Sequence, residues 1–211
     1  MVKRVGERIA KAAKLWLDTN GYPHYLDDYR WKYHLVDSPE VNAWCMPGGK
    51  IVVYTGILPI TQSETGLAVV MGHEVAHALA DHGAQRMSAS TLQQIGAYAG
   101  AIALQSSDYA KYTEQFMLAY GLGSNLGVML PFSRSNETEA DAIGIQIMAI
   151  AGYDPSEAPE LWKRMSAKSG GGSSSALLST HPSNESRIKN LTSLVPKARA
   201  EAAKFGVTSF K

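Results

Sequence analysis

The first twenty residues show an amphipathic pattern. Apolar residues recur there every three or four positions: Val5, Ile9, Ala12, Ala13 and Trp16. This spacing predicts a helix over residues 1–20 with one face turned to a core. Residues 1–4 carry the positive charge of a signal-peptide start, but no long apolar run follows them, so the segment is interpreted as part of the fold.

Strand signals follow the first helix. Three short segments rich in aromatic and β-branched residues predict strands: Trp31 to Val36, Ala43 to Cys45 and Lys50 to Tyr54. Pro47 and two glycines form a turn before the third strand. Helical patterns dominate the rest of the chain. The expected fold class is therefore α+β, mostly helical, with a small sheet.

Residues 67–80 are apolar almost all round, which predicts a buried helix. Within this helix lie His73, Glu74 and His77, in the order HExxH. Helical geometry places the two imidazoles on one face, where both can bind one Zn²⁺, with the glutamate beside them. Isolated polar groups are costly to bury, and a metal compensates for that cost. A metal site is therefore favoured over two chance core histidines.

A hydrolytic zinc site needs a third protein ligand and an open position. The extended metzincin pattern requires a histidine six residues after His77, but Gly83 stands there and His82 lies one residue early. Cys45 is the only cysteine and belongs to another element. The third ligand is therefore expected to be a carboxylate on a second helix.

That second helix is expected to begin near Ser133, where helix-capping residues precede apolar spacing. Glu137 and Asp141 lie four positions apart and share a face. Glu137 could reach the metal while Asp141 accepts a hydrogen bond from a ligand imidazole. The alternative is an acidic first turn favoured by the helix dipole.

The HExxH motif is followed about sixty residues later by Ser-Arg-x-x-Glu-x-x-Ala-Asp. This combination resembles the gluzincin family of CaaX-prenyl-protease and HtpX-type metallopeptidases, including its soluble cell-envelope members. Segments 42–56, 151–155 and 179–183 are similar to further landmarks of that family. The resemblance covers about residues 40–190 and implies a zincin-like fold, one Zn²⁺ per chain, Glu137 as third ligand and Asp141 behind the ligands. Length and composition predict a single domain over residues 1–211.

The same resemblance implies a mechanism and a compartment. A metal-activated water would hydrolyse peptide bonds of proteins, with Glu74 as general base. Unfolded or misfolded substrates and a periplasmic or envelope location are expectations from the family. A histidine such as His181 lies near the metal in the family, so it could stabilise the oxyanion or occupy the fourth zinc position. Arg187 could support either role. The alternatives are a turn histidine and a surface arginine.

An edge strand of a small sheet commonly holds an extended peptide in zincins. The candidate is the third predicted strand, or its partner in the sheet. Its residues are Ile51, Val52, Val53 and Tyr54. An ordinary hairpin packed on the core is the alternative.

Composition sets further bounds. The chain has 211 residues and 45% hydrophobic composition, which suits one sizeable core. Twenty Lys and Arg against nineteen Asp and Glu give no electrostatic footprint for nucleic acid. The most apolar stretch, residues 95–104, is too short to span a bilayer, so no transmembrane segment is expected. Oligomeric state is left open.

Two regions carry less information. Residues 168–175 have the composition of a flexible loop. Residues 88–132 are rich in Ser, Ala and Gly, which indicates close helix packing or a mobile lid, with packing favoured.

Two rival functions remain at this stage. One is a zinc-binding chaperone-like or latent module in which His181 closes the metal site. The other is a zinc hydrolase acting on small amides.

Overall fold

The computed structural model describes residues 1–169, 176–181 and 184–211. The expected flexible loop at 168–175 lies mostly outside these residues. The chain divides into two compact units, one formed by residues 1–80 and 138–211 and the other by residues 81–137. The two units are defined by how densely their residues contact one another, which does not decide the number of domains. The expectation of a single domain over residues 1–211 stays a prediction.

Helix α1 (Val2–Thr19) forms where the apolar spacing predicts it. Its inner face packs into the core of the first unit through Val5, Ile9 and Ala13, none of which exposes any surface. Full burial of a side chain of the size of Val or Ile stabilises the fold by about 1.5–3 kcal/mol. The charged residues of α1 occupy its opposite face.

The sheet of the first unit has three strands, β1 (Lys32–Val36), β2 (Ala43–Met46) and β3 (Lys50–Tyr54). Their order is β1-β3-β2, with β1 parallel and β2 antiparallel to β3. Gly48 and Gly49 take φ of +82° and +88° between β2 and β3, a conformation that glycine adopts without strain. This order makes β3 the central strand, paired on both sides.

Helix α3 (Glu64–Leu79) follows the short helices η1 (Thr55–Ile57) and α2 (Leu58–Thr61). The Ser63 side chain accepts a hydrogen bond from the Gly66 N–H at 3.0 Å, a typical N-cap. Almost every residue of α3 is buried. The continuous apolar run is therefore explained by a helix that crosses the interior of the first unit.

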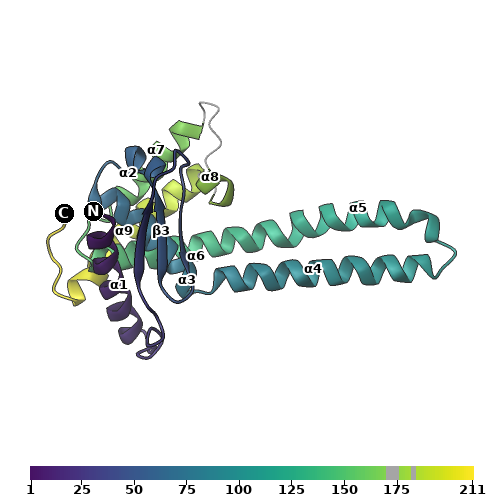
Figure 1. The fold of residues 1–211 in the computed structure, drawn as a ribbon, viewed down its shortest axis with the longest axis horizontal. Helices are drawn as coiled ribbons and strands as arrows, with labels where there is room; N and C mark the ends of the chain where they lie inside the picture. Colours follow the sequence, from purple (N-terminus) through teal and green to yellow (C-terminus); the bar gives the residue numbers. More distant parts are fainter. Residues whose placement is uncertain (170–175, 182–183) are drawn as a thin grey trace. The chain divides into compact units, whose positions relative to one another are not determined.

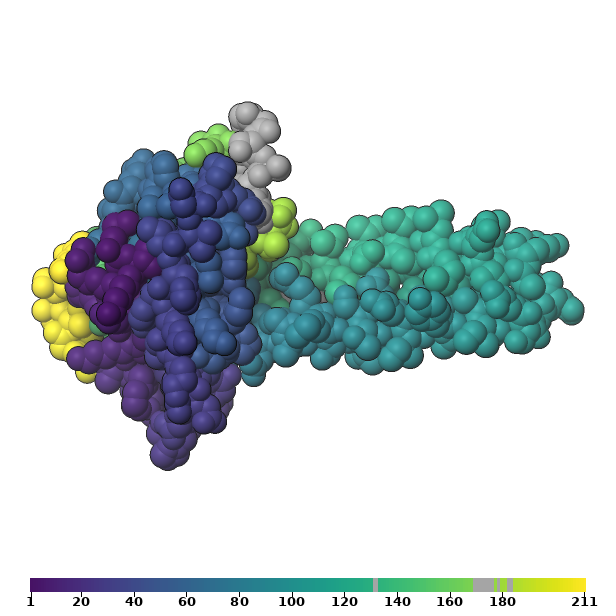
Figure 2. Space-filling model, in the orientation of Figure 1, coloured from purple at the N-terminus to yellow at the C-terminus, as the bar shows by residue number. Residues whose placement is uncertain are grey.

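The remaining helices of the first unit come from the C-terminal part of the chain: the later residues of α6 (Leu130–Ile150), then α7 (Glu157–Ser169), α8 (Ala176–Thr180) and α9 (Glu185–Lys204). Helix α7 packs against α3 and α9. The C-terminal segment lies beside α1 (Figures 1 and 2), and residues of both segments line a surface pocket. Arg8 of α1 also donates to the Ala151 carbonyl through Nε and Nη2, at 3.0 and 2.7 Å.

The start of α6 corrects one expectation. The helix begins at Leu130, so Ser133 lies inside it and not at its cap. Serine and asparagine favour caps because their side chains bond to nearby backbone groups. The same residues are tolerated within a helix when the preceding residues are already helical, as they are here.

The second unit is a helical hairpin built from α4 (His82–Gln105) and α5 (Thr113–Ser124). The 3-10 turn η2 (Ala110–Tyr112) joins them, and the π-helical turn η3 (Asn125–Met129) leads into α6. A Cβ on Gly96 or Gly100 would overlap Tyr120 or Phe116, so these glycines allow α4 and α5 to pack closely. This agrees with the packing interpretation of the region.

The hairpin also exposes many large apolar side chains, each more than half exposed: Met87, Leu92, Ile95, Tyr98, Ile102, Tyr109, Leu118, Leu122, Leu126 and Val128. Within the described part of the chain, no helix combines the length and apolar character needed to cross a membrane.

Candidate metal centre

Helix α3 carries three of the expected site residues. His73 and Glu74 are 3% and 5% exposed, and His77 is half-buried near the C-terminal end of the helix. The four-residue spacing brings His73 and His77 together, with 3.0 Å between their Nε2 atoms. Two imidazoles that share one helix face in this way can both donate to a single cation.

A close approach of two helices sets the distance between α3 and α6 beside His73. A Cβ built on Gly72 would lie 2.9 Å from the Gly144 carbonyl oxygen, and one on Gly144 would lie 2.9 Å from the His73 backbone nitrogen. Only glycine at both positions lets the two backbones approach so closely. The residues of α6 one turn before Gly144 are thereby held near the His73 side chain.

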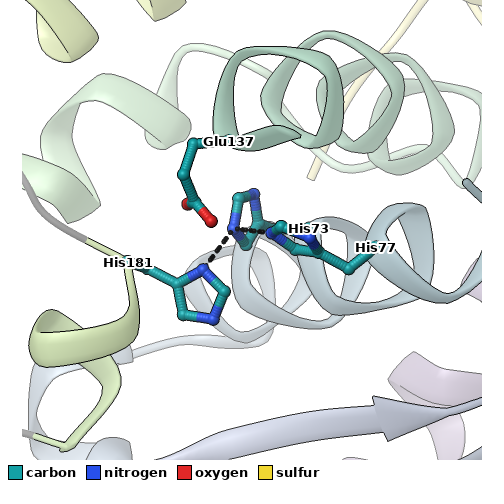
Figure 3. A group of neighbouring side chains, drawn as sticks. All are labelled: His73, His77, Glu137 and His181. Carbon is teal, nitrogen blue, oxygen red and sulfur yellow. Dashed lines mark hydrogen bonds between the residues drawn. The ribbon is translucent and has the colours of Figure 1, made fainter. Parts of the chain in front are cut away.

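Four side chains converge in this region: His73, His77, Glu137 and His181 (Figure 3). One donor atom from each lies within 4.8 Å of the others. His181 Nδ1 is 3.2 Å from His73 Nε2. Donor atoms around one tetrahedral zinc ion are separated by roughly 3.3 Å. The spacing of these nitrogens and the mixture of imidazole and carboxylate donors therefore fit a divalent metal.

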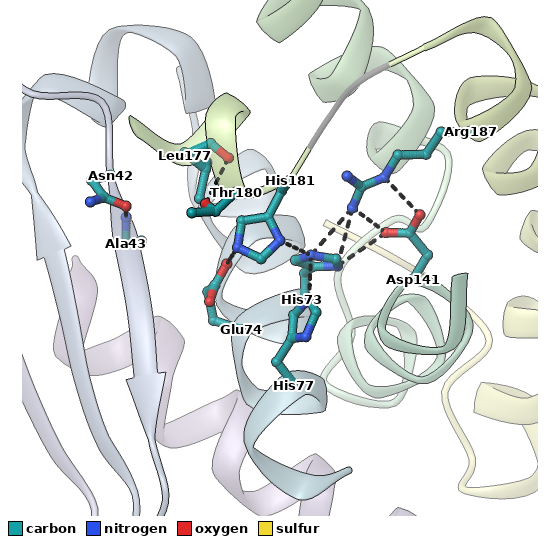
Figure 4. A network of polar contacts seen from close by, with 10 residues as sticks. All are labelled: Asn42, Ala43, His73, Glu74, His77, Asp141, Leu177, Thr180, His181 and Arg187. Carbon is teal, nitrogen blue, oxygen red and sulfur yellow. Dashed lines mark hydrogen bonds and ion pairs between the residues drawn. The ribbon is translucent and has the colours of Figure 1, made fainter. Parts of the chain in front are cut away.

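Asp141 lies one helical turn after Glu137 and contacts the other side of the His73 ring (Figure 4). Its Oδ1 is 3.0 Å from His73 Nδ1, and Arg187 donates to both of its oxygens at 2.8 and 2.7 Å. Burial alone would raise the pKa of the Asp141 carboxyl, but the hydrogen bond with His73 and the Arg187 guanidinium hold that pKa below its ordinary value. The ionised carboxylate accepts the Nδ1 proton, which leaves His73 Nε2 as the donor toward the group.

Glu74 occupies the side of α3 next to the four-residue group. Its Oε1 is buried and has no hydrogen-bond partner within the described residues, although His181 Nε2 lies 3.5 Å away. A buried carboxylate oxygen without a hydrogen bond is unfavourable in a purely structural role. The side chain therefore keeps an acceptor oxygen beside His181, one of the four converging residues.

His181 enters the group from the short helix α8. Its backbone N–H donates to the Leu177 carbonyl at 2.7 Å, which places it directly after the last turn of that helix. The Leu177 N–H in turn donates to the Val41 carbonyl at 3.2 Å, just before β2. Helix α8 therefore links the sheet edge to the donor group.

Comparison with known proteins assigns the family. A family model described as peptidase family M48 matches residues 1–195, nearly the whole chain. The chain belongs to peptidase family M48. The resemblance to gluzincin metallopeptidases that the motifs indicated is thereby confirmed.

Individual relatives agree with the M48 assignment. The mitochondrial metalloendopeptidase OMA1 of Schizosaccharomyces pombe is 38% identical over 177 residues, which cover 83% of this chain and 50% of that protein. The OMA1 protein of Arabidopsis thaliana is 36% identical over 211 residues, covering 96% and 41%. The β-barrel assembly-enhancing protease of Escherichia coli is 30% identical over 161 residues, covering 74% and 32%. The chain thus spans half or less of the length of these relatives.

The OMA1 relatives are named as metalloendopeptidases, and membership in peptidase family M48 implies a divalent metal. The mostly helical structure with a small sheet agrees with the expected α+β, zincin-like fold class. The convergent donors are the feature of the structure that suits such a metal.

The position of β3 corrects the expected peptide-binding strand of this M48 chain. Ile51, Val52, Val53 and Tyr54 form the central strand, and two of them, Ile51 and Val53, face the core. A strand paired on both sides has no free backbone groups for a peptide. Strand β2, its antiparallel partner, is an edge strand and packs against α3.

Cys45 lies on β2, and its thiol is unreactive. Burial, and then the negative charge of Glu74, raise the pKa of its thiol to about 12. The thiol is therefore protonated at neutral pH and is no candidate nucleophile or metal ligand. Strand β2 also packs against α3, the helix that carries Glu74.

Sequence reasoning missed two parts of the site. The Gly72 and Gly144 pair was invisible because its signal is a contact between residues far apart in the chain. Trp162 of α7 was also missed, although its ring lies 5.8 Å from the His73 ring. A single aromatic residue in a helical pattern is normally a core residue, so no local signal separates it from the rest of the core.

Proposed function

We propose that this chain is the catalytic domain of a zinc-dependent endopeptidase that cleaves unfolded or misfolded proteins. His73, His77 and Glu137 would hold one Zn²⁺ per chain. The observation that carries the proposal is the convergence of their donor atoms within 4.8 Å inside a buried site. Membership in M48 supplies the reaction class.

The chain's own residues would perform the proton transfers. When bound, the metal would polarise the scissile carbonyl and bring the pKa of a bound water to about 7. Glu74 would take the proton that this water loses on attack and pass it to the leaving amine. Its unbonded, buried Oε1 supports that role. Asp141 would fix the His73 tautomer through the 3.0 Å contact to Nδ1.

Removal of the metal tests the proposed function. Incubation with a strong chelator should abolish cleavage of an unfolded model protein, and one equivalent of Zn²⁺ per chain should restore it. The readout is the set of fragments identified by mass spectrometry, with zinc content measured in parallel. Cleavage that continues in zinc-free protein would overturn the proposal.

Strand β2 is the proposed binding edge for substrate. The Tyr54 N–H donates to the Asn42 carbonyl at 3.0 Å, so residue 42 directs its backbone toward β3. Alternation along an antiparallel pair then turns the backbone N–H and C=O of Cys45 outward. An extended peptide could pair with these groups by β-augmentation. A small amide could not, so this edge favours protein substrates.

Backbone methylation of a substrate peptide tests the edge. Methylation of the one amide nitrogen that faces the Cys45 carbonyl removes a hydrogen bond, and we expect KM to rise at least about fivefold. Methylation of the adjacent amide, which points away from β2, is the matched control and should leave KM unchanged. Equal effects of the two methyl groups would contradict pairing with β2.

Names of relatives bear on substrate and compartment. OMA1 is named as mitochondrial and the Escherichia coli relative as a protease that enhances β-barrel assembly. An envelope or periplasmic location and a role in protein quality control are therefore proposed for this chain. Comparison of membrane, periplasmic and cytosolic fractions from the source cells tests the location. Recovery in the cytosol alone would refute it.

A second candidate function is a latent form of the same site. His181 Nδ1 lies 3.2 Å from His73 Nε2, and His181 Nε2 is 3.5 Å from Glu74 Oε1. In helix α8, which precedes His181, the Leu177 N–H donates to the carbonyl of Val41, just before the proposed binding edge. In this arrangement His181 would be a fourth metal ligand, and its Nε2 would contact the Glu74 carboxylate that is proposed as the general base. The conformation is therefore proposed as a closed, resting state.

Replacement of His181 by alanine tests the resting state. We expect zinc content to remain at one per chain, because three ligands are left, and the initial rate of cleavage to rise. A site open about a tenth of the time would give a roughly tenfold rise. The exposed His24→Ala variant is the control. A large fall in rate with zinc retained would contradict closure and support an oxyanion-binding role for His181.

A further inference from the structure

Trp162 connects two parts of the site that are separate in sequence. Its indole, 2% exposed, projects from α7, and the guanidinium of Arg187 from α9 lies 3.5 Å from the centre of its ring. The His73 ring meets the same indole edge-on, at 5.8 Å and 73°. One aromatic side chain thus contacts both the cation behind the site and an expected metal ligand.

The cation that Trp162 contacts is paired with Asp141 and lies beside His73, with 3.2 Å between Arg187 Nη2 and His73 Nε2. Arg187 is 7% exposed and donates from Nε and Nη2 to the two oxygens of Asp141. Such a bidentate pair forms only when the guanidinium plane is aligned with the carboxylate. An aromatic face stacks on the guanidinium and fixes that plane. Without the indole, the buried guanidinium could rotate and retain only one of its two hydrogen bonds.

We infer that Trp162 is a positioning residue for the metal centre, which acts on His73 through Arg187 and Asp141. The indole of Trp162 stacks on the guanidinium of Arg187 and fixes its plane. The two hydrogen bonds from Arg187 then hold the Asp141 carboxylate in place. Asp141 in turn orients the His73 ring so that Nε2 is directed at the donor group. The indole, at a steep angle to the His73 ring, limits the tilt of that ring. This inference rests on the proposed role of His73 as a ligand.

The inference differs from simple filling of space. A leucine at position 162 would preserve an apolar core but would remove the aromatic face. A phenylalanine would preserve that face while removing part of the volume. If the ring matters as a stacking surface, the two substitutions should differ in their effect on the metal. If only volume matters, both substitutions should weaken the core, and they should not differ in their effect on metal binding.

Metal affinity of the Trp162 variants is the direct test. Zinc dissociation constants would be measured by competition with a chromogenic chelator for wild type, Trp162→Leu, Trp162→Phe and Arg187→Lys. We expect about a tenfold weakening for Trp162→Leu and for Arg187→Lys, which keeps charge but loses the planar pair, in line with residues behind metal ligands. Trp162→Phe should stay within about threefold of wild type.

Two controls separate this effect from unfolding. Leu161→Ala changes the neighbouring, fully buried residue of α7 and should lower the melting temperature while leaving zinc affinity unchanged. Circular dichroism of each zinc-free variant reports its folded fraction. Equal zinc affinity of wild type and Trp162→Leu, or equal losses for Trp162→Leu and Trp162→Phe, would overturn the inference. Absence of zinc binding by wild type would instead overturn the proposed function.

Discussion

Substitution of Glu74 by glutamine is expected to lower the turnover number by a factor of about 10² to 10⁴ while zinc stays bound. The amide keeps the size and hydrogen-bonding capacity of the side chain but cannot accept a proton at neutral pH. Because Glu74 is not among the converging donors, the metal should remain at one per chain. Binding of substrate should change little, so the loss should fall on kcat.

The measurement compares zinc-loaded wild type and zinc-loaded Glu74→Gln on the same unfolded protein. Glu139→Gln is the matched control, because Glu139 is an exposed carboxylate of α6 and should tolerate the change. Cleavage at wild-type rate by Glu74→Gln would remove this residue from the mechanism. Loss of zinc from the variant would show that Glu74 is a ligand and not the base.

Substitution of Glu137 by alanine has the second large expected effect. Removal of the only carboxylate in the donor group should weaken zinc binding by more than the roughly 10- to 100-fold typical of residues behind the ligands. Activity should be lost in parallel and should return in part at high zinc concentration. Equilibrium dialysis against buffered zinc would measure the affinity.

Glu139→Ala is the matched control for Glu137→Ala. Both residues lie on α6, two positions apart, so the variants share helix propensity and net charge, whereas Glu137 is buried and Glu139 is exposed. Glu139→Ala should bind zinc as wild type does. Equal zinc affinity of the two variants would show that Glu137 does not hold the metal.

The parts of the site that lie on one element could be predicted from the sequence. Helical spacing fixes the relation of His73 to His77 and of Glu137 to Asp141 regardless of the rest of the fold. The alternation and composition of the strands also gave their positions to within one residue, as β1 begins at Lys32 and β2 ends at Met46. Local periodicity is sufficient for features of this kind.

The parts that depend on distant contacts could not be predicted in this way. The order of strands is set by how the sheet packs, so nothing within Ile51–Tyr54 shows that β3 is central. Gly72 and Gly144 acquire their role only when two helices meet. The sequence left Arg187 open between a role near the metal and a surface position, and only the fold places it between Asp141 and Trp162.

The location of the metal tests the central claim most directly. Crystals of the zinc-loaded protein would be measured above and below the zinc absorption edge, and an anomalous difference map would be calculated. The account predicts one peak per chain, within bonding distance of His73 Nε2, His77 Nε2 and a carboxylate oxygen of Glu137. A peak elsewhere, or no peak between these residues in protein that binds zinc stoichiometrically, would contradict it.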